Sequence, residues 1–191
     1  MKKTWRGVGV VISFLFVFSC APKHMIKSEP LQKPSEGKAL VNFLRPSSTG
    51  GAAQVTIWDN DKLIGYTAGK MAFQYECDPG KHLFISWSEF KSPVEAELLP
   101  NRIYYIVLRI RMGWWRARLH QVAVNPQSEM WQDALTWQKT LPNYEPDAAA
   151  LAQIEAENHA KIMEYLQDYQ TEVAGSKYVQ YLRPEDGIIG K

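Results

Sequence analysis

The chain has little cysteine, no strong excess of either charge and no apolar run long enough to cross a membrane. Only Cys20 and Cys77 are present among 191 residues, which excludes a disulfide-rich scaffold. Lysine and arginine number 22 against 20 aspartates and glutamates, so nothing in the net charge suggests a nucleic-acid partner. The longest apolar run, residues 8–18, is about half of the ~20 residues that a spanning helix needs.

Motifs of common enzyme chemistry are missing as well. The sequence contains no Gly-x-Ser-x-Gly, no phosphate-binding glycine loop and no His-Glu-x-x-His. Asp59-Asn60-Asp61 begins like a calcium loop, but Lys70 stands where the bidentate glutamate is needed, so a hairpin turn is favoured. The four histidines lack metal-ligand spacing with cysteine or carboxylates, and we expect them to be solvated or to cap turns: His24, His82, His120 and His159. We therefore expect no metal, no cofactor and no catalytic residue.

The N-terminus combines a charged region, a short apolar region and a cysteine. Lys2, Lys3 and Arg6 precede residues 8–18, and Ser19-Cys20 follows. This order resembles the signal of bacterial lipoproteins, although Val17 and Phe18 replace the usual leucine and small residue.

The lipoprotein resemblance implies a signal peptide over 1–19 and a covalent diacylglycerol with an N-acyl chain on Cys20. Because Ala21 is not the aspartate that retains such proteins at the inner membrane, it implies an outer-membrane anchor facing the periplasm. Two or three chains would hold the protein firmly, whereas one holds only marginally. The alternative is an ordinary signal peptide with a chance cysteine.

Removal of 1–19 would leave 172 residues, with 19 basic residues against 20 acidic ones. Cys77 would then be a single thiol in an oxidising compartment, and two interpretations are open. It is either a small buried residue at a strand end, which we favour, or a reactive or intermolecular thiol.

Composition divides the remaining chain into three parts. Residues 20–37 are rich in Lys, Pro, Ser and Glu, which predicts a flexible tether after the lipidated cysteine. Residues 38–125 alternate β-rich runs with turn residues, which predicts an antiparallel β-sandwich. The expected strands are 39–44, 55–59, 63–67, 71–77, 82–88, 94–98, 103–111 and 116–124.

Residues 126–191 predict a C-terminal helical extension with a tail. A short helix is expected over 128–139 with Ser128 as its cap, and a long helix over 148–173 with Asp147 as its cap. The long helix carries an apolar stripe near the helical period, interrupted at Asn158. The sequence thus predicts a mainly β protein followed by one short and one long helix.

Three segments of the β region resemble one family pattern. They are Val55 to Gly65, then the Cys77-Asp-Pro-Gly-Lys-His82 turn, then the Asn101-Arg-Ile-Tyr-Tyr105 strand. The pattern is similar to the lipoprotein β-sandwich family called domain of unknown function 2846, itself similar to PEGA domains. The resemblance covers about residues 38–124 and implies export and a β-sandwich. It implies no catalytic residues.

The hairpin after residue 103 has a basic face. With a four-residue loop over 112–115, Arg109 would face Arg118 and Arg111 would face Arg116, with Trp114 and Trp115 at the tip. Like charges directly opposite each other are destabilising, so these arginines need anions nearby. Glu95 and Glu97 on the preceding strand are one source. The other is an anionic partner, for which arginine provides a bidentate grip.

These features predict a membrane-anchored envelope lipoprotein that acts as a non-enzymatic binding or scaffolding module. Its expected partners are the membrane and an envelope protein, peptidoglycan or anionic lipid. The alternative is an envelope enzyme that acts on cell-wall or lipid material. A cleft with convergent carboxylates, histidine and perturbed pKa values would favour the enzyme.

Overall fold

All eight strands expected from the sequence are present. The structure, a computed structural model, describes residues 24–48, 54–112 and 117–190, except for the side chains of 111, 112, 117 and 118. The eight strands are β2 (Ala39–Arg45), β3 (Val55–Asp59), β4 (Lys62–Thr67), β5 (Met71–Cys77), β6 (Gly80–Trp87), β7 (Lys91–Leu98), β8 (Arg102–Met112) and β9 (Ala117–Val124). At the turn between β5 and β6, Gly80 has a φ of 128°, a conformation that favours glycine.

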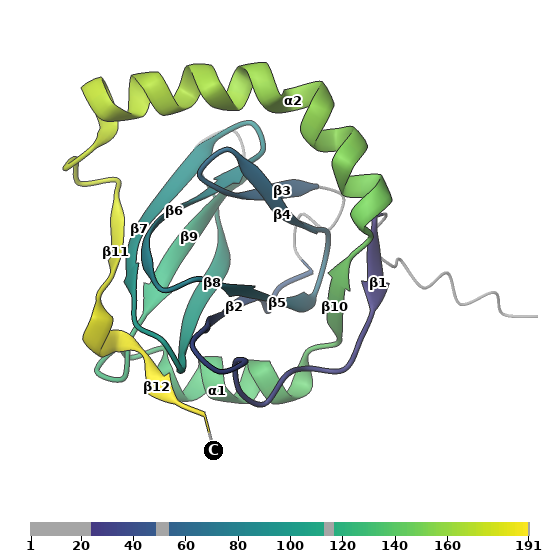
Figure 1. Ribbon diagram of the computed structural model, residues 1–191, viewed down its shortest axis with the longest axis vertical. Helices are drawn as coiled ribbons and strands as arrows, with labels where there is room; N and C mark the ends of the chain where they lie inside the picture. Colours follow the sequence, from purple (N-terminus) through teal and green to yellow (C-terminus); the bar gives the residue numbers. More distant parts are fainter. Residues whose placement is uncertain (1–23, 49–53, 113–116, 191) are drawn as a thin grey trace, which may run out of the picture.

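Two sheets form the body of the protein (Figure 1). Sheet A has the order β1-β10-β5-β2-β8-β12, with β9 paired to β8, and sheet B has the order β11-β7-β6-β3-β4. The additional strands are β1 (Met25–Lys27), β10 (Asn143–Pro146), β11 (Gln180–Leu182) and β12 (Ile188–Ile189). Pairs β2–β8, β10–β5 and β11–β7 are parallel, so the expectation of a wholly antiparallel sandwich is wrong. These pairs join segments far apart in sequence, which no hairpin turn constrains.

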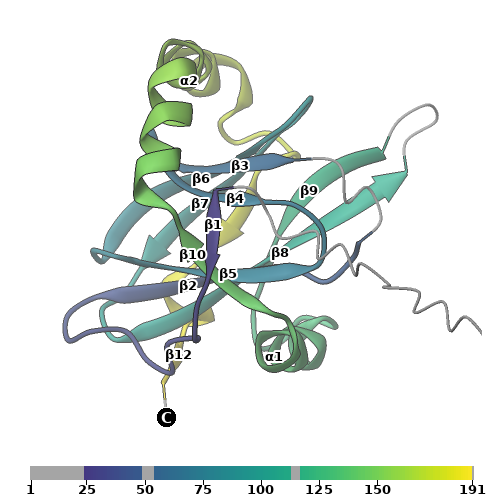
Figure 2. The same ribbon diagram turned by 90° about the vertical axis from the view of Figure 1, so that its right-hand side faces the viewer.

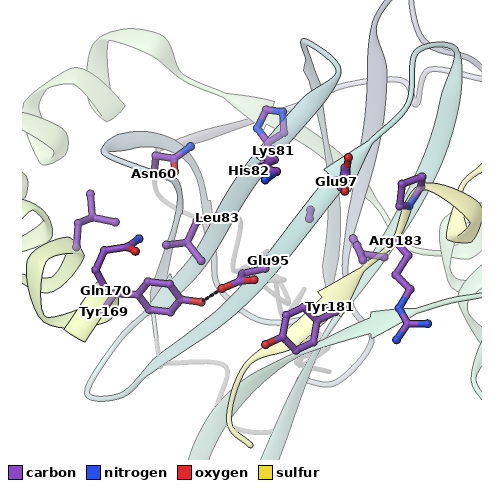
Figure 3. A pocket seen from close by; sticks show the side chains of 14 residues that line it. Asn60, Lys81, His82, Leu83, Glu95, Glu97, Tyr169, Gln170, Tyr181 and Arg183 are labelled. Carbon is purple, nitrogen blue, oxygen red and sulfur yellow. Dashed lines mark hydrogen bonds between the residues drawn. The ribbon is translucent and has the colours of Figure 1, made fainter. Parts of the chain in front are cut away.

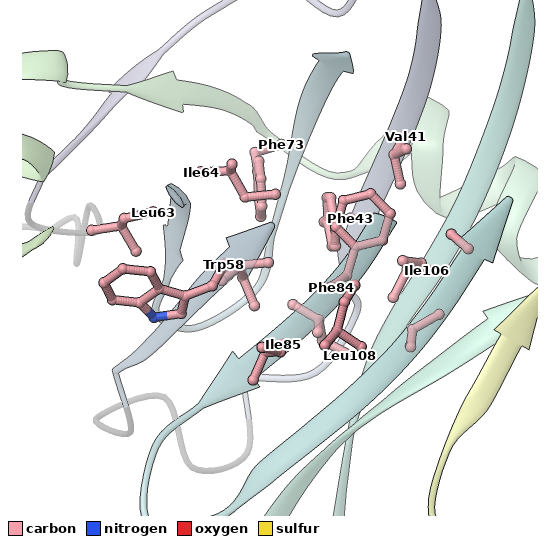
Figure 4. Close-up of a cluster of buried hydrophobic side chains, with 14 of the residues drawn as sticks. Val41, Phe43, Trp58, Leu63, Ile64, Phe73, Phe84, Ile85, Ile106 and Leu108 are labelled. Carbon is pink, nitrogen blue, oxygen red and sulfur yellow. The ribbon is translucent and has the colours of Figure 1, made fainter. Parts of the chain in front are cut away.

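The main hydrophobic core lies between the sheets (Figure 4). Phe43 of β2 stacks on Phe73 of β5 and meets Phe84 of β6 edge-on, with ring centroids 4.7 and 5.5 Å apart. Gln121 of β9 ties the sheets together, because its side-chain amide donates to the carbonyls of Phe84 and Ser92. The strands expected to alternate inward and outward therefore enclose one shared core.

Helix α1 (Trp131–Thr140) covers the outer face of sheet A. A second apolar cluster joins Ala134 of α1 to Leu40, Leu44 and Tyr105 of the sheet, and the Tyr105 hydroxyl donates to Gln138. This explains why both faces of β8 are buried near residue 105. The expected cap is also wrong: the helix starts at Trp131, and Ser128 instead donates to the carbonyl of Asn125.

Helix α2 (Ala148–Asp168) covers the outer face of sheet B, so the two sheets lie between two helices (Figure 2). Asp147 caps it as expected, accepting from the amides of Ala149 and Ala150 at 3.1 and 3.3 Å. The Lys91 ammonium lies over the rings of Trp87 on β6 and Tyr165 on α2 and so joins helix to sheet. The last expected helical turn is a π-helix, η1 (Tyr169–Val173).

The segment before β2 does not behave as a flexible tether in its described part, residues 24–37. β1 pairs with β10, the amide of Leu31 donates to Gln74, and the amide of Ser35 donates to Glu76. This segment packs against sheet A despite its low apolar content, because hydrogen bonds of its backbone supply the contacts. Residues 1–19 and 20–23 lie outside the described residues.

The C-terminal part is likewise not a separate helical extension. Residues 126–190 contribute β10 to sheet A, β11 to sheet B and β12 to sheet A, besides the helices. The boundary expected at residue 125 therefore does not separate two structural units.

Candidate functional site

A pocket of about 780 Å³ opens on the outer face of sheet B beside the end of α2. β6, β7 and β11 form its floor, with η1 on one side and the turn after β3 on another. Most of its lining side chains are polar or charged: Asn60, Lys81, His82, Glu95, Glu97, Tyr169, Gln170, Tyr181 and Arg183 (Figure 3). A pocket of this volume is in the range that holds a drug-sized ligand.

Strand register brings the charged residues together. Lys81 of β6 is paired with Glu97 of β7, and Leu83 is paired with Glu95. On the other side of β7, Tyr181 of β11 is paired with Glu95. Because directly opposed residues lie on the same face of a sheet, these side chains share the outer face of sheet B.

Tyr169 forms one wall of the pocket. Its ring is buried, and its hydroxyl donates to Glu95 Oε1 at 2.6 Å. Burial raises the pKa of Tyr169 and the hydrogen bond to the Glu95 carboxylate raises it further, so the phenol stays protonated as a donor. Tyr169 is also the first residue of η1, and π-helical turns are frequent at functional sites.

The pocket charges are not neutralised by ion pairs among the described residues. Within those ranges the salt bridges are Lys38–Asp78 and His82–Asp59. Lys81, Glu97 and Arg183 form none with another described residue, although Lys81 and Glu97 are register partners. The walls thus present two positive and two negative side chains to whatever enters.

His82 is held in a buried ion pair at the edge of the pocket. Its Nδ1 lies 2.8 Å from Asp59 Oδ2, and its Nε2 lies 2.9 Å from the carbonyl oxygen of Asp78. Burial alone lowers the pKa of His82, but the hydrogen bonds to Asp59 and Cys77 and the Asp59 charge outweigh it and raise the pKa to about 10. Both partner oxygens are acceptors, so both ring nitrogens carry protons.

This geometry leaves His82 unsuited to general-base catalysis. A base needs a free lone pair near the substrate, and the imidazolium has none. Asp59 also accepts from the Tyr75 hydroxyl at 3.2 Å and from the Asn60 amide at 3.0 Å. The cluster therefore ties the β5–β6 turn to the end of β3.

Cys77 is the last residue of β5 and is buried beside this cluster. This agrees with its interpretation as a small buried residue at a strand end. The side chain contributes to the raised pKa of His82.

The arginine hairpin has a different register from the expected one. Arg109 is paired with His120, and Arg111 is paired with Arg118. β8 and β9 extend to Met112 and Ala117, so the expected pairs Arg109–Arg118 and Arg111–Arg116 are wrong by two residues. Arg109 is exposed and its guanidinium lies 3.5 Å from Met130 Sδ. Trp114, Trp115 and Arg116 lie outside the described residues, as do the side chains of Arg111 and Arg118.

Glu95 and Glu97 do not neutralise this hairpin. They lie on the outer face of sheet B and line the pocket, whereas Arg109 lies on the α1 side of sheet A. β7, which carries both glutamates, is not a neighbour of β8, because β8 pairs with β2, β9 and β12 in the other sheet. Cys20, the expected lipid attachment site, lies outside the described residues.

Sequence reasoning missed the pocket. Lys81 lies more than 80 residues before Tyr169, Tyr181 and Arg183, and the pairing of β11 with β7 and the Tyr169–Glu95 hydrogen bond join the two segments. The one local signal was the alternation of Glu95 and Glu97, which correctly placed both side chains on an outward face.

No protein-family model and no curated protein matches the chain. Among the described residues, no helix combines the length and apolar character needed to cross a membrane. The same part of the chain holds no cluster of three or more His, Cys, Asp or Glu side chains placed to bind a metal ion.

Proposed function

We propose that this protein is a lipid-anchored lipoprotein of the bacterial envelope that acts as a non-enzymatic binding or scaffolding module. Lipid on Cys20 attaches it to the periplasmic face of the outer membrane, and the pocket on sheet B takes the partner. The charged region, apolar run and cysteine at the N-terminus support the anchor. The two-sheet fold is compatible with the resemblance to the family of domain of unknown function 2846.

The observation that carries this proposal is the path from the anchor to the pocket. At most about 14 Å of extended chain separates Cys20 from His24, four residues later. The His24 carbonyl accepts from the amide of Asp147, the residue that caps α2, at 3.0 Å. α2 then runs for 21 residues, about 30 Å of helix, to the residues that line the pocket. The pocket is thus presented about one helix length from the point of attachment.

Binding fits the pocket better than catalysis. Both nitrogens of His82 are engaged, and Glu95 already accepts the Tyr169 hydroxyl. The pocket is instead built from charged side chains, tyrosine rings and a small apolar surface at Leu83 and Leu166, which are the components of a recognition site.

One observation favours the second candidate, an envelope enzyme. Glu95 and Glu97 share one face of β7 and line the same pocket as His82, whose pKa is raised. Paired carboxylates are the usual machinery of glycoside hydrolysis. Release of soluble fragments from purified peptidoglycan by the protein, abolished in Glu97→Gln, would establish this candidate instead.

The β8–β9 hairpin offers a second contact surface. β2 pairs with β8 only as far as Val107, so the backbone from Leu108 to Met112 pairs with β9 alone. Arg109, Arg111 and Arg118 lie on this projecting part, and the sequence adds Arg116, Trp114 and Trp115. Near an anionic membrane each arginine contributes on the order of 1 kcal/mol. We propose this hairpin as the contact with anionic lipid or peptidoglycan.

Metabolic labelling with palmitate in the native host tests the anchor. The chain has two cysteines, so Cys77→Ala is a matched control for Cys20→Ala. We expect label and outer-membrane fractionation in Cys77→Ala and neither in Cys20→Ala. Label that persists in Cys20→Ala would refute the proposed attachment. In-cell crosslinking with mass spectrometry then identifies what the pocket face contacts.

A further inference from the structure

The pocket holds charges of both signs within one concave surface, and these charges form no ion pairs with the residues that the structure describes. Lys81 and Arg183 supply positive charge, and Glu95 and Glu97 supply negative charge. A purely anionic ligand would meet the two glutamates, and a purely cationic ligand would meet the lysine and arginine. A neutral ligand would cover four charges without pairing them, which costs desolvation free energy.

The positions of these charges suggest the polarity of the ligand. Glu95 and Glu97 are two residues apart on β7, in the middle of the floor. Arg183 directly follows β11 on one side of β7, and Lys81 lies across from Glu97 on the other side (Figure 3). Opposite charges thus lie one strand apart, a separation that a short chain with an ammonium group and a carboxylate can bridge.

The other walls suit a peptide. Leu83 and Leu166 form apolar surface, and the rings of Tyr169 and Tyr181 stand beside it. Tyr181 is 47% exposed, so a ligand can still cover it. The hydroxyl of Tyr169 orients one oxygen of Glu95 and leaves the other without a hydrogen bond from the described residues.

From these observations we propose that the pocket binds a short zwitterionic peptide, with its ammonium group at Glu97 and Glu95 and its carboxylate at Arg183. The inference rests on the proposed binding function and names the chemical class of the ligand. Arginine grips a carboxylate through paired hydrogen bonds, and charge-assisted hydrogen bonds are the stronger ones. Peptides with both free amines and free carboxylates fit this description, whatever polymer or protein they derive from.

Isothermal titration calorimetry of the full chain in detergent micelles tests the inference. The probes are tripeptides Ala-Xaa-Ala with both termini free, the same peptides N-acetylated, and the same peptides C-amidated. We expect the free peptides to bind and each blocked form to bind at least about tenfold more weakly.

Two charge-removing variants link the termini to their partners. Glu97→Gln should weaken the free peptide about tenfold and leave the N-acetylated peptide unaffected, because the ammonium group is already lost. Arg183→Gln should likewise weaken binding of the free peptide about tenfold and leave binding of the C-amidated peptide unaffected, because the carboxylate is already lost. Glu145→Gln on β10 and Lys27→Gln on β1 remove exposed charges from the edge of sheet A and should change nothing.

Three results would overturn the inference: no binding of any free tripeptide at millimolar concentration, equal binding of the free, N-acetylated and C-amidated peptides, or tight binding of a neutral oligosaccharide that these variants do not alter. Any of them leaves the palmitate test of the anchor unaffected. Palmitate label that persists in Cys20→Ala, together with intact peptide binding, would refute the anchor and retain the ligand.

Discussion

A helix covers the outer face of each sheet, but the cover is complete on sheet A and partial on sheet B. On sheet A, the short α1 seals the sheet, because Trp131, Leu135 and Trp137 pack against a buried apolar cluster. On sheet B, the long α2 seals only part of the sheet. Near its C-terminal end the helix becomes a π-helix, and the sheet beneath carries Lys81, Glu95 and Glu97 instead of apolar residues.

The difference shows that helix length does not decide whether a sheet is covered. α1 buries its sheet with ten residues because the strands beneath it carry buried apolar side chains on both faces. α2 has twice the length, yet charged side chains on β6 and β7 prevent close packing at its end. A charge cannot be buried without a partner, so the sheet stays open there. Four predictions test this comparison.

The largest loss of stability is expected beneath α1, where the helix covers sheet A completely. Leu44 is fully buried beneath α1, so Leu44→Ala should lower the free energy of unfolding by about 3 kcal/mol through lost burial and a cavity. Leu166→Ala at the half-open pocket should cost about 1 kcal/mol or less, since water already reaches this side chain. Urea unfolding measures both values. Equal costs would contradict the contrast between the two faces.

The His82–Asp59 pair should make stability depend on pH. The pKa of His82 is about 10 in the folded protein and about 6.5 in the unfolded chain, so the stabilisation is complete below pH 6.5 and is lost as the pH rises toward 10. We expect the free energy of unfolding to fall by about 2 kcal/mol between pH 7 and pH 9. His82→Gln should flatten this slope. An unchanged slope in the variant would show that another group titrates.

The Tyr169–Glu95 hydrogen bond holds the π-helix to sheet B. Tyr169→Phe should cost about 1.5 kcal/mol, because a hydrogen bond to a charged acceptor is lost while the ring still packs. Tyr178→Phe, whose side chain is exposed, is the matched control and should cost nothing measurable. Thermal unfolding compares the two. A similar loss in both variants would assign no special role to the Glu95 contact.

The smallest effect is expected at the helix starts. Asp147→Ala removes the side-chain cap of α2 and should cost about 1 kcal/mol. Ser128→Ala should cost less, because the Ser128 side chain caps none of the amides of α1 and the backbone hydrogen bond from Trp131 to the Ser128 carbonyl remains. Chemical denaturation distinguishes these costs. A larger loss from Ser128→Ala would mean that the turn before α1 contributes more than a helix cap.

Local sequence patterns predicted much of the fold. Strand alternation predicted β2 to β9, Asp78-Pro79-Gly80 predicted the β5–β6 turn, and Asp147 predicted the start of α2. These features depend on neighbours within a few residues, where side-chain periodicity and backbone preference act directly. The short strands β1, β10, β11 and β12 carried no such pattern, because two to four residues contain too little alternation to recognise.

The sequence predicted only parts of the candidate site. The outward orientation of Glu95 and Glu97 followed from strand alternation, but their expected partner, the arginine hairpin, lies on the other sheet. His82 was expected to cap or be solvated, and it does contact the Asp78 carbonyl of its turn. The ion pair between His82 and Asp59 forms because β3 and β6 are neighbours in sheet B. These two strands are not consecutive in the sequence, so local patterns do not predict that they pair.

By itself, the sequence determined the alternation of eight strands and the amphipathic long helix with its cap. Tertiary structure alone decided that residues 25–27, 143–146 and 180–182 join the sheets as strands. It also decided that Arg183 and Tyr169 meet Glu95, Glu97 and Lys81 around one pocket. The physical reason is the sequence distance over which each feature is decided. Local periodicity determines which side of a helix or strand a residue occupies, whereas pairing between distant strands depends on the packing of the whole chain.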